Sequence, residues 1–383
     1  MAAQLRRRRP CRQARLRQGP GRVPGGPGVP RPARRSRSVN PRIERLRESL
    51  EEPLLVTNPT NVLYLFGFKS SNAALLVEQE RVRLFTDFRY AEAARAIDEV
   101  EFEETKRSLL WDLAGRLSGR IGFEADYVSY SGYETLGVGA VEPVPRRGLV
   151  ERLRAVKDEQ ELAAIKRACE ITDRMFERLV DETFVGRRER DVAWTIGQLF
   201  NEEGADQVAF ESIVASGPNA ARPHARATER EIRPGETVVI DTGCFIDGYA
   251  SDYTRTFVTG PVDGVIKEAY AVVLAAQQAG IDAMRSGIAG VDADAAARRV
   301  VDETSFAGTF GHGLGHGLGL EVHEAPRMST ESTDTLASGN VVTVEPGIYL
   351  EGRAGIRIED NVVVVNSGVE NYTGFRKDLI AVD

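Results

Sequence analysis

The sequence of 383 residues is poor in cysteine, tryptophan, histidine and long hydrophobic runs. Its three cysteines, Cys11, Cys169 and Cys244, form an odd set without paired spacing. Such a set argues against a disulfide framework and favours a reducing compartment, so we expect a cytoplasmic protein. The longest uninterrupted apolar run, residues 269–276, is too short to cross a bilayer, and we expect no membrane partner.

Acidic residues are absent from the first 40 residues, which hold 12 arginines and no lysine. The rest of the chain has 38 basic and 57 acidic residues, a net charge of −19. Nucleic-acid binding needs clustered positive charge, so this acidic body argues against nucleic acid as the main partner, and we expect none. Residues 1–40 are rich in glycine and proline and have no apolar stretch after the arginines, which predicts a disordered tail rather than a signal peptide. A transit peptide or a wrongly assigned start are the alternatives.

The hydrophobic pattern after residue 40 predicts two domains. Residues 41–148 read as a small α/β domain, in which short strands alternate with helices. Residues 149–383 mix helices and strands without a repeating βα unit, so an α+β architecture fits better than a Rossmann sheet. The expected elements are helices at 43–50, 89–97, 162–179, 192–200, 266–284 and 293–303, and strands at 54–56, 74–77, 82–86, 238–241, 253–259, 341–349 and 356–365.

All four histidines lie in the second half of the chain. His312, His316 and His323 fall within twelve residues, in GHGLGHGLGLEVHEAP, and His224 precedes them. Glycines in this segment let the backbone pass close to a bound ion or ligand. Since histidine is so rare elsewhere in the chain, the cluster predicts a functional site rather than an incidental glycine-rich loop.

Four carboxylates stand in or beside apolar strand candidates. Asp241 ends one strand and Asp252 begins the next, while Glu345 interrupts VVTVEPGIY and Glu359 interrupts GIRIEDNVVVV. Burying unpaired carboxylates is expensive, and Arg357 alone cannot neutralise four of them, whereas two divalent metals can. An oxygen-rich set with one histidine nitrogen favours Mn, Co, Fe or Zn over a thiolate zinc finger. Two-metal sites of this kind serve hydrolysis.

The order Asp, Asp, His, Glu, Glu in these motifs resembles the pita-bread metallopeptidases, among them aminopeptidase P, prolidase, methionine aminopeptidase and the metal-free creatinase. The likeness extends to IVASGPNAARPH and LRAVKDEQELAAIKRA, and to LLVTNPTNVLYLFGF and FTDFRYAEAA in the first half. It covers about residues 42–383. The resemblance implies a pita-bread α+β catalytic domain over 149–383, preceded by a smaller α/β creatinase-like domain over 41–148.

The resemblance also implies a metal-ligand set. Asp252 and Glu359 would bridge two divalent ions, and Glu345 would also move the proton to the leaving amine. Manganese is the favoured metal, with Co, Fe or Zn as alternatives. The full set of ligands would be Asp241, Asp252, His316, Glu345 and Glu359.

Four further residues match family positions around these ligands. His224 and His323 match histidines that contact substrate and the tetrahedral intermediate, so both are catalytic and substrate-binding candidates. His312 matches a histidine that shapes the substrate pocket without binding metal. Arg357 matches an arginine that orients the bridging carboxylates.

The implied function is hydrolysis of the N-terminal Xaa-Pro bond of a peptide, as in aminopeptidase P. The alternatives are a prolidase acting on Xaa-Pro dipeptides, and a hydrolase or lyase acting on a small non-peptide substrate. A non-enzymatic binding module would require a broken ligand set, and all five ligands are present. In relatives with the extra N-terminal domain, that domain covers the site, often across a dimer, so we also expect a homodimer.

Overall fold

The computed structural model describes residues 40–383. The tail predicted for residues 1–40 therefore lies, except for Asn40, outside the described residues, as does Cys11. Asn40 caps the first helix by accepting hydrogen bonds from the N–H groups of Arg42 and Ile43. No helix within residues 40–383 is long and apolar enough to span a bilayer.

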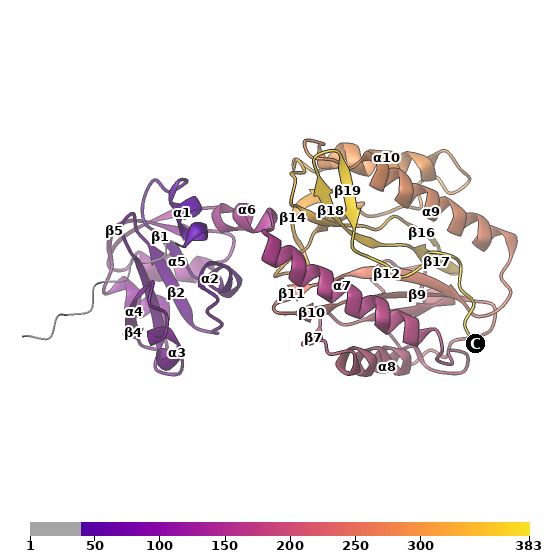
Figure 1. Cartoon of the computed structure of the whole chain (residues 1–383), viewed down its shortest axis with the longest axis horizontal. Coiled ribbons are helices and arrows are strands. Elements are labelled where there is room, and N and C mark those ends of the chain that lie inside the picture. The colour runs from indigo at the N-terminus through magenta and orange to yellow at the C-terminus, as the bar shows by residue number, and fades with distance from the viewer. Residues whose placement is uncertain (1–39) are drawn as a thin grey trace, which may run out of the picture. The chain divides into compact units, whose positions relative to one another are not determined.

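The first part of the described chain, coloured indigo to purple in Figure 1, is built on a six-stranded sheet with the strand order β4-β3-β2-β1-β5-β6. The strand β1 is antiparallel to β2 and parallel to β5, and apolar clusters cover both faces of the sheet. The strands are β1 (Leu54–Val56), β2 (Ala73–Val77), β3 (Val82–Asp87), β4 (Glu101–Thr105), β5 (Ser118–Glu124) and β6 (Ala140–Arg146). The helices are α1 (Pro41–Arg47), α2 (Pro59–Phe66), α3 (Ala91–Arg95), α4 (Leu109–Ala114) and α5 (Tyr130–Leu136).

Three helices follow: α6 (Leu149–Ala155), α7 (Glu159–Leu179) and α8 (Glu189–Glu202). A capping box starts α7, because the Asp158 side chain accepts from the first turn while the Glu161 side chain accepts from the Asp158 N–H. The apolar stripe of α7 is buried, as its three- and four-residue spacing predicts. Together with α8 it packs on the strands β8 (Ile213–Ser216), β9 (Thr237–Thr242) and β12 (Tyr253–Val258), which form an antiparallel sheet.

A second helix pair, α9 (Gly264–Ala283) and α10 (Gly290–Asp302), lies side by side in Figure 1 and packs on a five-stranded sheet. The order of that sheet is β14-β13-β15-β18-β19. Its strands are β13 (Gly315–Gly317), β14 (Glu324–Met328), β15 (Val341–Val344), β18 (Asp360–Val365) and β19 (Gly368–Asn371). The shorter strands are β7 (Gln207–Val208), β10 (Cys244–Ile246), β11 (Tyr249–Ala250), β16 (Gly347–Leu350) and β17 (Ala354–Arg357).

Two strand predictions are wrong in one respect, because the runs 341–349 and 356–365 each form two strands. The first breaks at Glu345 and Pro346, between β15 and β16, and the second at Ile358 and Glu359, between β17 and β18. At each break the glutamate N–H turns to another segment: that of Glu345 donates to the Leu314 carbonyl at 2.8 Å, and that of Glu359 to the Thr254 carbonyl at 3.1 Å. Both glutamates therefore stand where the chain passes from one sheet to another.

Candidate metal centre

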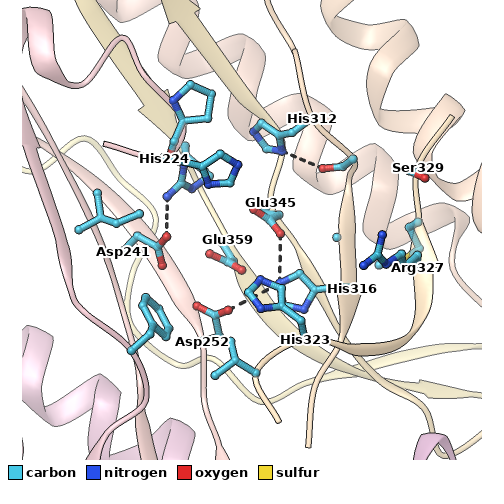
Figure 2. A pocket seen from close by; sticks show the side chains of 18 residues that line it. His224, Asp241, Asp252, His312, His316, His323, Arg327, Ser329, Glu345 and Glu359 are labelled. Carbon is cyan, nitrogen blue, oxygen red and sulfur yellow. Dashed lines mark hydrogen bonds and ion pairs between the residues drawn. The ribbon is translucent and has the colours of Figure 1, made fainter. Parts of the chain in front are cut away.

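A cavity of about 570 Å³ in the second half of the chain gathers every site residue that the sequence predicts (Figure 2). The predicted residues that line it are His224, Asp241, Asp252, His312, His316, His323, Glu345, Arg357 and Glu359. They come from segments as far apart in sequence as residues 224 and 359, so the fold itself assembles the site.

The carboxylates are placed by strand ends. Asp241 is near the end of β9 and pairs in register with Thr254 of β12, while Asp252 comes directly before β12. Glu345 follows β15 and Glu359 precedes β18. Because β15 and β18 are neighbours in one sheet, these two glutamates reach the same edge.

His316, in β13, faces the carboxylates (Figure 2). Its Nε2 lies 3.6 Å from Asp252 Oδ2 and 3.5 Å from Glu345 Oε1. Its Nδ1 is 3.0 Å from the Gly317 carbonyl, so Nδ1 carries the proton and the Nε2 lone pair is directed at the acids. Burial lowers the pKa of His316 to about 4, which keeps the ring neutral and able to bind a metal.

The positively charged groups around the four carboxylates are too few to neutralise them. Burial, followed by the charge of Asp241, raises the pKa of Asp252 well above its ordinary value. Burial and the charge of Asp252 do the same for Glu359, and burial raises the pKa of Glu345 to about 7. One Asp241 oxygen, Oδ1, is buried without a hydrogen-bond partner among residues 40–383.

These observations fit divalent cations. Asp252, His316 and Glu359 offer ligand atoms that all lie within 4.8 Å of one another. A hard, oxygen-rich set with one imidazole suits a divalent ion of the manganese-to-zinc series. An ion held by these three residues would offset the repulsion that raises the pKa values of Asp252 and Glu359, while Asp241 and Glu345 line the same cavity outside this group of three.

Arg357 is the single cation hydrogen-bonded to this carboxylate group within the described chain. Its Nη2 donates to Asp241 Oδ2 at 2.6 Å, and its Nε donates to the Thr254 hydroxyl at 3.0 Å. That hydroxyl in turn donates to Glu359 Oε2 at 2.7 Å. Arg357 therefore orients Asp241 directly and Glu359 through Thr254.

His312 uses both ring nitrogens away from the carboxylates. Its Nδ1 donates to the Gly313 carbonyl at 2.8 Å, so Nε2 accepts from the Tyr349 hydroxyl at 2.9 Å. The same hydroxyl accepts from Arg357 Nη1 at 2.9 Å. Burial lowers the pKa of His312 to about 4, and the neutral ring is held in one orientation.

His323 and His224 line the cavity without such anchoring of their rings. The ring centroid of His323 is 4.3 Å from that of His316, and burial lowers the His323 pKa. His224 lies on the segment that follows a short 3-10 turn at Gly217–Asn219. Both imidazoles remain partly exposed to the cavity, where a ligand can reach them.

Sequence reasoning missed Arg327, Tyr349 and Thr254. Arg327 lines the same cavity, and its charge is close enough to lower the pKa of both His316 and His323. A signal existed for Arg327, since it stands four residues after His323 and directly follows the histidine motif. Tyr349 and Thr254 act through tertiary contacts with Arg357, which no local pattern reveals.

Comparison with known proteins places the two halves of the chain in described families. Residues 163–366 match the model of metallopeptidase family M24, and residues 42–156 match the creatinase/prolidase N-terminal domain. An Xaa-Pro dipeptidase of Pyrococcus horikoshii is 32% identical over 351 residues, covering 87% of this chain and 95% of the relative.

Solved structures agree with these matches. The Xaa-Pro dipeptidase from Bacillus anthracis is similar with a TM-score of 0.86 and 36% identity, over 89% of this chain and 99% of that one. The X-Pro aminopeptidase from Thermotoga maritima has a TM-score of 0.79 and 34% identity, over 89% of this chain and 100% of its own.

Proposed function

Because the chain belongs to metallopeptidase family M24, with a creatinase/prolidase N-terminal domain ahead of the catalytic one, we propose that it is a dinuclear-metal exopeptidase that hydrolyses the N-terminal Xaa-Pro bond of peptides. Membership confirms the predicted resemblance and the predicted α+β fold. The observation that carries the proposal is the convergence of four carboxylates and a neutral histidine on one cavity. The names of the dipeptidase and aminopeptidase relatives support Xaa-Pro peptides as the substrate class.

The ligand set of the proposal is the predicted one. Asp252 and Glu359 are the proposed bridging ligands, which their shared proximity to His316 supports. Two divalent ions held here supply the Lewis acidity that amide hydrolysis needs. Manganese is the metal we favour, because the set is dominated by oxygen, with Co, Fe or Zn as alternatives. The five proposed ligands are Asp241, Asp252, His316, Glu345 and Glu359.

Three side chains would then handle the reacting atoms. Glu345, whose carboxyl titrates close to neutrality in the metal-free protein, is suited to take a proton and pass it to the leaving amine. His323 and His224 line the same cavity and can donate N–H groups to the oxygen of the carbonyl under attack. The neutral His312, held against Tyr349, would form a wall of the substrate pocket.

A second candidate, dipeptidase activity, is favoured by Arg327. Its guanidinium lines the cavity and pairs with no carboxylate among residues 40–383, while its backbone N–H is held by Asp334 Oδ2 at 2.7 Å. An unpaired arginine suits a free carboxylate, and in an Xaa-Pro dipeptide the C-terminal carboxylate lies directly beyond the proline ring. A longer peptide places an uncharged amide there instead.

Matched peptides separate the two candidates. Manganese-loaded protein is assayed with Ala-Pro, its C-terminal amide, Ala-Pro-Ala and Ala-Ala. Turnover of the proline substrates with no turnover of Ala-Ala supports the proposed function, and no turnover of any proline peptide with Mn, Co, Fe or Zn refutes it. If the site is a dipeptidase, Arg327→Gln raises KM about 10- to 100-fold for Ala-Pro and leaves the amide unchanged. An unchanged KM for Ala-Pro favours the aminopeptidase.

Assembly and location complete the proposal. We propose a homodimer, which light scattering on the purified full chain tests directly. The two cysteines of the described chain, Cys169 and Cys244, are free and buried, which supports a reducing compartment and hence the cytoplasm. The peptide remains the proposed partner.

A further inference from the structure

Glu189 is a buried carboxylate that the proposed chemistry does not use. It is the first residue of α8 and is fully buried. No lysine or arginine pairs with it directly among residues 40–383. Its oxygens instead accept five hydrogen bonds: from the Ser216 N–H at 2.7 Å and hydroxyl at 2.8 Å, the Asn219 side-chain amide at 2.7 Å, and the Thr228 N–H at 3.0 Å and hydroxyl at 2.6 Å.

These donors lie at both ends of one segment, residues 216–228, which we call the His224 loop. Ser216 ends β8, and the loop returns beside the start of α8, where the Arg190 N–H donates to the Thr228 carbonyl at 3.1 Å. A single carboxylate therefore ties the outgoing and returning ends of the loop together. Four of the five donor groups have no other acceptor among residues 40–383, so loss of this carboxylate would leave them unpaired, while the Asn219 amide also donates to the Arg226 carbonyl at 3.1 Å.

The tip of the loop is held from the catalytic side. The Pro223 carbonyl accepts from Arg357 Nη1 at 3.1 Å, directly before His224. The loop backbone also passes so close to β17 that a Cβ added at Gly355 would lie 1.8 Å from the Ala220 carbonyl oxygen. No side chain of residues 40–383 hydrogen-bonds the His224 ring. The backbone of the loop therefore sets the position of the imidazole.

We propose that Glu189 is a positioning residue for His224, acting through the two ends of the His224 loop. The role of His224 in this inference rests on the proposed function. The five hydrogen bonds of Glu189, which we call the clamp, do not depend on it. The carboxylate is required because all five partners are donors. A glutamine would present its NH₂ group to some of them and leave buried donors unpaired. Arg230 donates to the Ser216 hydroxyl at 2.6 Å, and that hydroxyl donates to Glu189. Arg230 therefore stabilises the negative charge of Glu189 through Ser216.

The test compares Glu189→Gln with the wild type, both fully loaded with manganese, on Ala-Pro. We expect kcat to fall on the order of 10- to 100-fold, because a small displacement of a reacting group slows the reaction by about this factor. KM should stay within about twofold of the wild-type value, and the metal content should be unchanged. The matched control is Glu124→Gln, which changes another buried carboxylate that accepts the Thr57 and Asn58 N–H groups at the start of α2. It should leave kcat unchanged.

A double-mutant cycle separates positioning from general support of the fold. In the His224→Ala background, Glu189→Gln should cost less than about twofold in kcat, because the group it positions is gone. An equal loss in both backgrounds, or wild-type kcat in Glu189→Gln, overturns the proposal. If Glu189→Gln does not fold, Thr228→Val removes one donor instead and should lower kcat in the same direction, and an unchanged kcat in that variant refutes the clamp.

Hydrogen exchange gives a readout that does not depend on turnover. In Glu189→Gln the amides of residues 216–228 should exchange at least about tenfold faster, while those of β9 and β12 keep their wild-type rates. Unchanged exchange in the His224 loop refutes the clamp even if the enzyme is active. Faster exchange in a protein that cleaves no proline peptide keeps the clamp and refutes the proposed function.

Discussion

In the metal-free protein, the buried Glu345 carboxyl should contribute a stability that is lost as the pH rises towards neutrality. Burial raises the pKa of this carboxyl from its ordinary 4.5 to about 7 in the absence of metal. Between these two values the folded state binds more protons than the unfolded state, so the free energy of unfolding falls as the pH rises. A displacement of this size is worth on the order of 3 kcal/mol. That stability is present below about pH 4.5 and is lost by about pH 7.

Other groups titrate over the same range, so the wild type alone cannot isolate this effect. Burial lowers the pKa of His312 and His316 from 6.5 to about 4, and their contribution runs in the opposite direction, increasing as the pH rises to 6.5. Glu345→Gln removes the carboxyl and keeps the two histidines. The substitution also removes the Glu345 charge, which raises the pKa values of Asp252 and Glu359 in the wild type. The variant is therefore less sensitive to rising pH at these residues too, and the difference in stability between variant and wild type keeps its sign.

The measurement is urea unfolding of chelator-treated wild type and Glu345→Gln at a series of pH values from 4.5 to 7.5. The variant should gain on the order of 3 kcal/mol over the wild type across this range. Adding a divalent metal to the wild type at pH 7.5 should restore its stability, since ligation removes the repulsion. A difference between the two proteins that stays constant within about 0.5 kcal/mol would show that burial does not raise the pKa of Glu345.

Two further predictions concern the histidines and the first 40 residues. His323→Ala should keep both metals yet lose on the order of 10²–10³ in kcat, the usual effect of one oxyanion donor, whereas His316→Ala should lose metal together with activity. Elemental analysis and steady-state kinetics on both variants decide this, and the reverse pattern would exchange their roles. Deleting residues 1–40 should leave kcat and the melting temperature unchanged, since that stretch offers almost nothing apolar to bury. A drop of several degrees, or a loss of turnover, in the truncated protein would refute it.

The long elements were predictable because their patterns are strong over many residues. The apolar stripe of α7 predicts a helix, and the apolar runs of β9 and β12 predict strands. These patterns are clear because burial of one helix face or of a whole strand dominates the energetics of these elements. The candidate ligands were predictable for the opposite reason. A carboxylate in an apolar run is a local contradiction that only a functional contact resolves, and all four lie at the same cavity.

The features that the sequence did not predict depend on tertiary contacts. The breaks at Glu345 and Glu359 depend on carbonyl groups of Leu314 and Thr254, which are remote in sequence. A continuous apolar run with one acid in it does not reveal that the chain changes sheets at the acid. Glu189 was missed for a related reason, because at the start of a helix it looks like an ordinary charge that complements the helix dipole.

The electrostatics of the site connect metal binding to pH. Burial already keeps the His316 ring neutral down to about pH 4, so protonation of the histidine does not limit metal binding near neutrality. The carboxyl groups do limit it, because burial and mutual repulsion raise the pKa values of Asp252, Glu345 and Glu359 in the metal-free protein. Metal must therefore displace protons from carboxyl groups that the fold prefers to keep neutral. The burial that destabilises the metal-free protein at neutral pH is thus also the reason that bound metal stabilises it.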